Sequence, residues 1–223
     1  MKIVNVARTL LALALFAAGP AVRSQVQSQV QSQEGAGAAA QIDIGGGYSV
    51  MVPVGEGWRA TDASGSPASY LKILGPESHS LALIAATGPS GITPQEIRAI
   101  GGPNAADQVV KLIGRFVSSA WKSHAAGLQD ARYETVETVN ETGGKYSFGK
   151  FFCGYSRIVV RDRGAMVDGV PATLRHVAYS CITFPDMVTA ANVTYSERGR
   201  EQDLSSEAMA EGERFALSLQ RRP

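Results

Sequence analysis

Two strand-like segments, each carrying one of the chain's only two cysteines, most constrain the fold. They read "FFCGYSRIVV" and "RHVAYSCITF", and they place Cys153 and Cys181 28 positions apart. If the segments pair antiparallel with the cysteines opposite each other, Tyr155 faces Tyr179. Because side chains alternate along a strand, this register separates an apolar face from a polar one. The sequence therefore predicts two paired strands with the cysteines directly across from each other.

The two faces of this strand pair differ in chemistry. The apolar face carries Phe152, Ile158, Val160, Leu174, Ala178, Ile182 and Phe184. The polar face carries Tyr155, Arg157, Arg161, Arg175 and Tyr179. Arginine and tyrosine are residue types that favour interfaces and anionic groups, so we interpret the polar face as a candidate binding surface. The alternative is a solvated sheet face, or arginines whose aliphatic stems lie beneath a helix.

One feature conflicts with this register. A two-residue turn at Asp168 and Gly169 would place the partner of each residue three positions later than the cysteine pairing does. Either the turn lies elsewhere in "RGAMVDGVP", or a β-bulge shifts the ladder between the turn and the cysteines. Both alternatives stay open at the level of sequence.

Residues 1–24 are typical of an export signal. Lys2 and Arg8 give a positive start, "LLALALFAAG" is an apolar run too short to span a bilayer, and small residues follow. We expect cleavage after Ala21 or Ser24, with an uncleaved N-terminal anchor as the alternative. No later stretch approaches the roughly 18 consecutive apolar residues of a membrane-spanning helix. The predicted location is periplasmic or secreted, without stable membrane insertion.

Export bears directly on the cysteine pair. An oxidising compartment and an even number of cysteines favour a structural disulfide. It would close a loop of about 29 residues, which stabilises a fold by roughly 3–4 kcal/mol in the chain-entropy model. A redox site would use a C-x-x-C spacing, and a metal site needs further ligands, whereas His79, His124 and His176 show no ligand spacing. We therefore predict a disulfide and expect neither metal nor cofactor.

Composition bounds the class of protein. Removal of residues 1–24 leaves 18 basic and 20 acidic residues, which argues against nucleic-acid binding driven by bulk charge. Residues 25–47 are rich in Gln, Ser, Ala and Gly and are predicted to be a low-complexity linker. Residues 48–223 then form one domain of ordinary size.

Hydrophobic periodicity within that domain predicts an α+β fold. A helix is expected to begin at the Thr93 cap, and a longer one runs from about Asn104 to Gly127. A last helix is expected to end with Arg221 and Arg222 in its final turn, where cations favour the helix dipole. Strands are predicted at 48–54, 70–75, 80–88, 131–139, 145–161, 172–184 and 190–198. This order of strands, helix, strands and helix predicts an antiparallel sheet packed between helices.

A family resemblance adds to this reading. The first strand with its proline and tryptophan turn, "YSVMVPVGEGW", and the closing "ERFALSLQ" resemble the PsbP-like family of extrinsic photosystem subunits and exported bacterial relatives. The resemblance implies an α/β/α sandwich and an accessory or binding role without known catalysis. The low-complexity leader and the cysteine pair depart from the family pattern and leave the specific role open.

Motifs of common enzymes are missing. There is no G-x-S-x-G elbow, no H-E-x-x-H, no phosphate-cradling glycine loop and no evident pair of carboxylates. We expect a non-catalytic binding or accessory protein of the bacterial envelope, whose partner is an envelope protein or an anionic small ligand. The alternative is a periplasmic hydrolase whose catalytic groups come from distant positions.

Overall fold

The computed structural model describes residues 40–61, 68–75, 79–143 and 145–222. The expected signal peptide, residues 1–24, and the linker up to residue 39 lie outside this part of the chain. The linker prediction was wrong at its end, because Gln41–Gly45 already forms strand β1. Ile44 of this strand is fully buried in the main core, and this burial explains why a strand forms within a glycine-rich segment.

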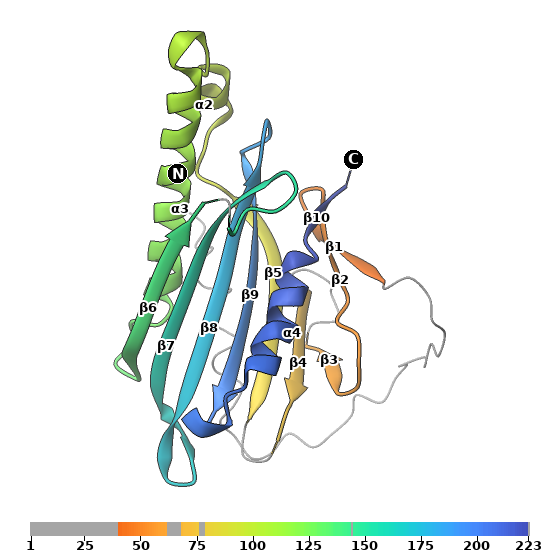
Figure 1. The fold of residues 1–223 in the computed structure, drawn as a ribbon, viewed down its shortest axis with the longest axis vertical. Coiled ribbons are helices and arrows are strands. Elements are labelled where there is room, and N and C mark those ends of the chain that lie inside the picture. The colour runs from red at the N-terminus through yellow and green to blue at the C-terminus, as the bar shows by residue number, and fades with distance from the viewer. Residues whose placement is uncertain (1–39, 62–67, 76–78, 144, 223) are drawn as a thin grey trace, which may run out of the picture.

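The fold is α+β, as predicted, with an antiparallel sheet packed between helices (Figure 1). The helices are α2 (Pro94–Arg98), α3 (Ala105–Ala126) and α4 (Ser206–Leu217). The strands after β1 are β2 (Tyr48–Met51), β3 (Trp58–Ala60), β4 (Ala68–Ile73), β5 (Ser80–Pro89), β6 (Tyr133–Thr142), β7 (Phe151–Val167), β8 (Val170–Thr183), β9 (Thr189–Gly199) and β10 (Gln220–Arg221). The main sheet has the order β3-β4-β5-β9-β8-β7-β6, and a smaller sheet has the order β1-β2-β10.

The predicted register of the cysteine strands is confirmed. Cys153 of β7 lies opposite Cys181 of β8, and a disulfide joins them. The β7–β8 turn is nevertheless at Asp168 and Gly169, whose φ angles of 50° and 79° are typical of a type I′ hairpin turn. An irregularity between Asp162 and Met166 shifts the ladder. The bulge therefore resolves the conflict between the turn and the cysteine pairing.

Helix α3 covers one face of the sheet. Its Phe116 and Val117 are buried, and Trp121 Nε1 donates a hydrogen bond of 3.0 Å to the carbonyl oxygen of Tyr155. The predicted apolar face of β7 and β8 lies beneath it, with Ile158 and Ile182 buried. The outer ends of that face differ from the prediction, because Phe152 and Phe184 are 40% and 52% exposed.

Helix α4 covers part of the opposite face. Its Phe215 and Ala216 are buried in the main core. Gly212 lies so close to Tyr195 of β9 that a Cβ atom there would be 2.3 Å from the ring. The predicted polar face is therefore polar only in part, because the disulfide and Tyr179 belong to this core.

The C-terminus differs from the prediction. Helix α4 ends at Leu217, and Arg221 belongs to strand β10, which pairs with β2. The backbone nitrogen of Arg222 donates a hydrogen bond of 2.8 Å to the carbonyl oxygen of Gly47. The open edge of β2 offers these backbone hydrogen bonds, which a helical terminus could not make. Among the described residues, no helix combines the length and hydropathy that crossing a membrane requires.

Candidate functional site

Part of the sheet face on the side of α4 has no helix in front of it. In Figure 1, α4 lies in front of β9 and β5, whereas the lower parts of β6 and β7 carry no helix in front of them. The register places alternate residues of β7 on this side, from Tyr155 to Arg161. We call this surface the outer face and define it by Glu134, Glu137, Tyr155, Arg157, Val159, Arg161 and Arg175.

The arginines of the outer face already have carboxylate partners. Arg157 contacts Glu137 at 2.5 Å, and Glu134 contacts both Arg161 at 3.4 Å and Arg163 at 2.8 Å. The hydrogen bond from Arg163 holds the pKa of Glu134 below its usual range, and Glu137 raises the pKa of Arg157. The outer face is therefore a ladder of paired charges. It does not present a cluster of unpaired cations, which an anionic ligand would need.

The two tyrosines of the predicted surface have different positions. Tyr155 stacks on Tyr146 with ring centroids 4.4 Å apart and is half-buried. Tyr179 is only 2% exposed, and its hydroxyl donates a hydrogen bond of 3.3 Å to Glu213 of α4. Burial raises the pKa of both hydroxyls. The assignment of Tyr179 to the surface was therefore wrong, because α4 and the core cover it.

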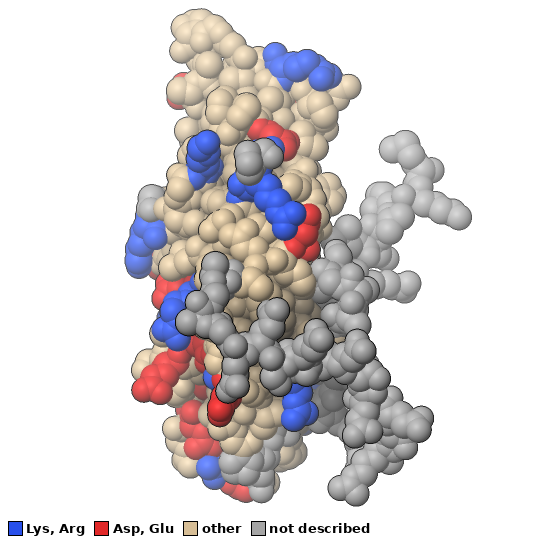
Figure 2. Space-filling view, turned by 90° about the vertical axis from the view of Figure 1, so that its right-hand side faces the viewer, with Lys and Arg blue, Asp and Glu red and all other residues tan. Residues whose placement is uncertain are grey.

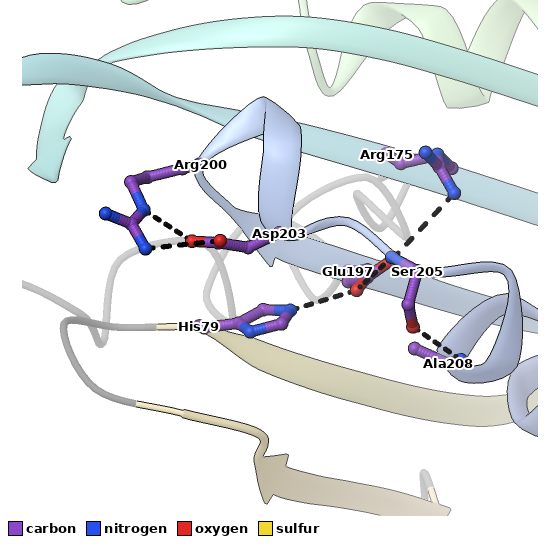
Figure 3. Close-up of polar contacts among 7 residues, drawn as sticks. All are labelled: His79, Arg175, Glu197, Arg200, Asp203, Ser205 and Ala208. Carbon is purple, nitrogen blue, oxygen red and sulfur yellow. Dashed lines mark hydrogen bonds and ion pairs between the residues drawn. The ribbon is translucent and has the colours of Figure 1, made fainter.

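Arg175 connects the outer face to a buried carboxylate (Figure 3). The side chain of Glu197 on β9 has no exposed surface, and Arg175 lies 3.9 Å from it. The backbone nitrogen of Ser205, the N-cap of α4, donates to both carboxylate oxygens at 3.0 and 3.2 Å. His79, just before β5, adds a contact of 2.9 Å through Nε2. Donors from three parts of the chain thus compensate the cost of burying this charge.

This arrangement orients the imidazole of His79. An ionised carboxylate only accepts hydrogen bonds, so against it Nε2 of His79 is the donor and Nδ1 lies on the other side of the ring. Within the described part of the chain, Nδ1 has no hydrogen-bond partner. Gly199 permits the close packing of the ring, since a Cβ atom there would lie 2.9 Å from Cδ2 of His79. Sequence reasoning missed this residue, because only the pairing of β5 with β9 brings His79 to Glu197.

His79 lines a cleft at the end of the sheet. The cleft has a volume of about 350 Å³ and lies between the β4–β5 turn, the tip of the β7–β8 hairpin and the connection from β9 to α4. It is lined by Leu74, Gly75, His79, Val167, Asp168, Arg200 and Asp203. Arg200 contacts Asp168 and Asp203 at 2.5 Å each, and its hydrogen bond lowers the pKa of Asp203. A second cleft along α4 shares Leu74 and His79 with the first.

The described lining of the two clefts offers few nucleophilic groups. The only hydroxyl among the described lining residues belongs to Ser205, and its Oγ caps α4 by accepting from the Ala208 nitrogen at 3.0 Å. The carboxylate of Glu197 is fully engaged by structural donors. Across the described residues, no group of three or more His, Cys, Asp or Glu side chains is arranged to hold a metal ion.

A pair of half-buried histidines and a buried aspartate group lie away from these clefts. The rings of His124 and His176 lie 5.1 Å apart between α3 and β8. Burial lowers the pKa of His124 to about 3 and that of His176 to about 4, and His176 contributes to the shift of His124. Asp162 is fully buried and is paired with Arg132 and Arg198. Both groups hold the fold together, and neither lines the clefts.

Comparisons with known proteins leave the family open. No family model and no curated protein matches this chain. One solved structure, the Ran-binding protein Mog1p of Saccharomyces cerevisiae, is similar over 82% of this chain and 96% of its own, with 11% identity and a TM-score of 0.44. A likeness of this size assigns neither a family nor a partner to the present chain.

Proposed function

We propose that this protein is an exported, non-catalytic binding or accessory domain of the bacterial envelope that engages a partner protein through its outer face. The observation that carries the proposal is the helix-free surface on strands closed by a disulfide. On it, Tyr155, Arg157 and Arg161 alternate with glutamates of the neighbouring strand. Tyrosine on a rigid support loses little conformational entropy on binding.

The charge pattern favours a protein partner over a small anion. Arg157 and Arg161 pair with glutamates on an exposed surface, and such ion pairs contribute only about 0–1 kcal/mol each. They can therefore be exchanged for intermolecular pairs with a surface of complementary, alternating charge. Figure 2 views the molecule from the right-hand side of Figure 1, and acidic and basic side chains lie close together in its lower half.

The resemblance to the PsbP-like family supports the same proposal. A sheet with a helix on each face agrees with the architecture that the resemblance implies. The accessory role of that family fits clefts whose described lining residues include no evident nucleophile. Membership of the family is part of the proposal and rests on "YSVMVPVGEGW" and "ERFALSLQ".

One observation favours the alternative of a periplasmic hydrolase. A histidine oriented by a buried carboxylate, as His79 is by Glu197, is an arrangement that general bases use. Such an enzyme would need a nucleophile or an activated water near Nδ1. Hydrolysis of esters or peptides that is abolished by His79→Gln in a folded protein would establish the enzyme. Activity equal in both proteins would remove His79 from catalysis.

Site-specific photo-crosslinking in the cell of origin tests the binding proposal. A benzoylphenylalanine residue replaces Val159 on the outer face or, as a matched control, the exposed Ser119 of α3. The proposal predicts one discrete crosslinked protein from position 159 and none from position 119. Its yield should fall at least fivefold when Arg157 and Arg161 are also exchanged for alanine. No crosslink from position 159, or the same product from both positions, would contradict the proposal.

A further inference from the structure

We propose that the partner protein adds an extended segment to the free edge of strand β6, and that this segment carries lysine or arginine at every second position. The inference rests on the proposed function, because the same partner covers the outer face beside this edge. In the described sheet, β6 is the last strand and pairs with β7 alone. Figure 1 shows β6 at the left-hand edge of the sheet.

The backbone of β6 offers hydrogen-bonding groups to a further strand. Its ladder with β7 is regular from Glu137 to Thr142, beyond the bulge between Thr135 and Glu137. Because the amide and carbonyl groups of successive residues point to opposite edges of a strand, every second residue here directs its pair away from β7. Apart from this ladder, the described residues give the β6 backbone one hydrogen bond, from the Tyr133 nitrogen to the Asp130 carbonyl oxygen at 2.8 Å. Within the described part of the chain, the outward groups of residues 137–142 are thus open for pairing.

Helix α3 leaves this stretch of β6 accessible. Thr138 lies opposite the buried Ile158 and therefore points to the side of α3, as does Asn140 two residues later. Both Thr138 and Asn140 are nevertheless exposed. On the other side of the sheet, the side chains of Glu137 and Glu141 are 46% and 44% exposed. An added strand can thus place its own side chains on both sides of the sheet.

The side chains of β6 favour a basic segment. Glu134, Glu137 and Glu141 all lie on the side of the outer face, and β6 contains no lysine or arginine. These glutamates would be the nearest neighbours of an added strand, about 5 Å away, whereas the arginines of β7 lie one strand further. Opposite charges across neighbouring strands stabilise the pairing, and like charges destabilise it. Lysine or arginine at every second position of the segment would therefore face this row of carboxylates.

The present partners of these glutamates leave room for a second cation. Glu137 contacts Arg157 at 2.5 Å, and Glu134 contacts Arg161 at 3.4 Å and Arg163 at 2.8 Å. All three arginines belong to β7 and approach from the inner side of β6, whereas an added strand would approach from the opposite side. Each carboxylate offers about four lone-pair positions and can accept hydrogen bonds from both sides. Rows of arginine, glutamate and partner cation would then alternate across three strands.

The same row of charges disfavours a second copy of this chain at the edge. Two β6 strands paired antiparallel about Val139 would place Glu137 of each chain opposite Glu141 of the other. Like charges directly opposite each other destabilise such a pair. Edge charges and a bulge are devices by which proteins avoid pairing with their own copies. The segment that fits this edge therefore belongs to a different protein and is basic.

Binding of synthetic peptides to the oxidised, full-length protein tests the inference. The probe is a fluorescein-labelled octapeptide of alternating threonine and lysine, and the charge control has glutamate in place of lysine. Fluorescence anisotropy should show saturable binding of the lysine peptide and binding of the glutamate peptide that is weaker by about tenfold or more. Two further lysine peptides carry N-methyl groups, one on every lysine and the other on every threonine. Because a strand pairs through alternate residues, one of these two should not bind, and the other should bind like the unmethylated peptide.

Two measurements locate the contact at β6. In amide hydrogen exchange, the lysine peptide should slow every second amide of residues 137–142 and leave β3, the opposite edge strand of the sheet, unchanged. A variant with Glu137→Gln and Glu141→Gln should bind the lysine peptide about fivefold more weakly. The matched control carries Glu56→Gln and Glu207→Gln at exposed positions outside the main sheet and should keep the native affinity.

The outcomes separate this inference from the proposed function. Equal binding of the two N-methylated peptides, equal affinities for the lysine and glutamate peptides, or slow exchange of all β6 amides before any peptide is added would overturn the inference. A crosslink from position 159 without peptide binding would overturn the inference and leave the outer face as the binding surface. Strand pairing by the lysine peptide without any crosslink from position 159 would support the edge and contradict the proposed function.

Discussion

At the scale of single residues, two helical glycines have opposite environments. A Cβ atom at Gly212 of α4 would lie 2.3 Å from the ring of Tyr195, whereas Gly114 of α3 has nothing within 4 Å of that position. Alanine gains about 1 kcal/mol over glycine in a helix interior, while overpacking of a core costs about 1–3 kcal/mol. The steric clash therefore makes an alanine at Gly212 destabilising, whereas helix propensity makes an alanine at Gly114 stabilising.

The first prediction follows from this contrast. Gly212→Ala should lower the free energy of unfolding by about 1–2 kcal/mol, and Gly114→Ala should raise it by about 0.5–1 kcal/mol. Urea unfolding monitored by circular dichroism measures both changes. A stabilised Gly212→Ala variant would show that α4 does not lie against Tyr195 as described.

The second prediction concerns the half-buried pair of His124 and His176. The pKa values of about 3 for His124 and about 4 for His176 lie below the unfolded value of about 6.5, so the unfolded state binds more protons between these limits. The free energy of unfolding should therefore fall as the pH decreases from 7 to 5. Each of the two histidines lowers it by up to about 1.4 kcal/mol for each pH unit. The carboxylates of Glu134 and Asp203 have lowered pKa values, so they become protonated mainly at lower pH. Their contribution to the free energy of unfolding is lost only in that lower range.

Substitution separates the histidines. A variant with His124→Gln and His176→Gln should lose most of the decline between pH 7 and 5, whereas His79→Gln should retain it. The measurement is urea unfolding at both pH values. An equally steep decline in the variant that lacks both histidines would contradict the assignment of the decline to this pair.

At the scale of elements, the disulfide strands show what the sequence could predict. The alternation in β7 and β8 predicted their pairing, because the separation of an apolar from a polar face and the two cysteines allow few registers. The apolar pattern of α3 repeats every three to four residues over the whole helix and predicted that helix in the same way. The short strands β1, β3 and β10 were missed. They have too few residues to show an alternation of apolar and polar side chains, and their pairing partners determine their structure.

The candidate site could be predicted only in part. Tyr155, Arg157 and Arg161 follow from strand alternation, but the burial of Tyr179 depends on where α4 packs. The cleft joins the β4–β5 turn, the β7–β8 tip and the start of α4, which are far apart in the sequence. No local pattern connects His79 with Glu197, because their contact depends on the strand order of the sheet.

The third prediction is argued at this scale. Replacing Cys153 and Cys181 by alanine should lower the free energy of unfolding by about 2–4 kcal/mol, since the disulfide closes a loop of about 29 residues. The fold should persist, because backbone pairing of β7 and β8 continues on both sides of the bridge. Urea unfolding of the oxidised protein and of the alanine variant measures the difference. Equal stability would show that the bridge does not constrain the unfolded chain.

At the scale of the whole molecule, the main sheet has α3 on one face and α4 on part of the other, and a smaller sheet of β1, β2 and β10 completes the fold. The disulfide lies in the core beneath α4 and the N-terminal hairpin, next to the helix-free surface. In the proposed function, the bridged strands β7 and β8 hold the outer face rigid, and its alternating charges pair with those of a partner protein.

The proposed function depends most directly on export with a closed disulfide. Intact mass spectrometry of the protein recovered from an exporting bacterial host, with and without reductant and alkylating agent, tests both together. We predict a chain that begins at Val22 or Gln25, is two hydrogens lighter than its reduced form, and reacts with the alkylating agent only after reduction. A retained N-terminus, or two cysteines alkylated without reduction, would contradict the account of an exported domain whose binding surface rests on the bridged strands.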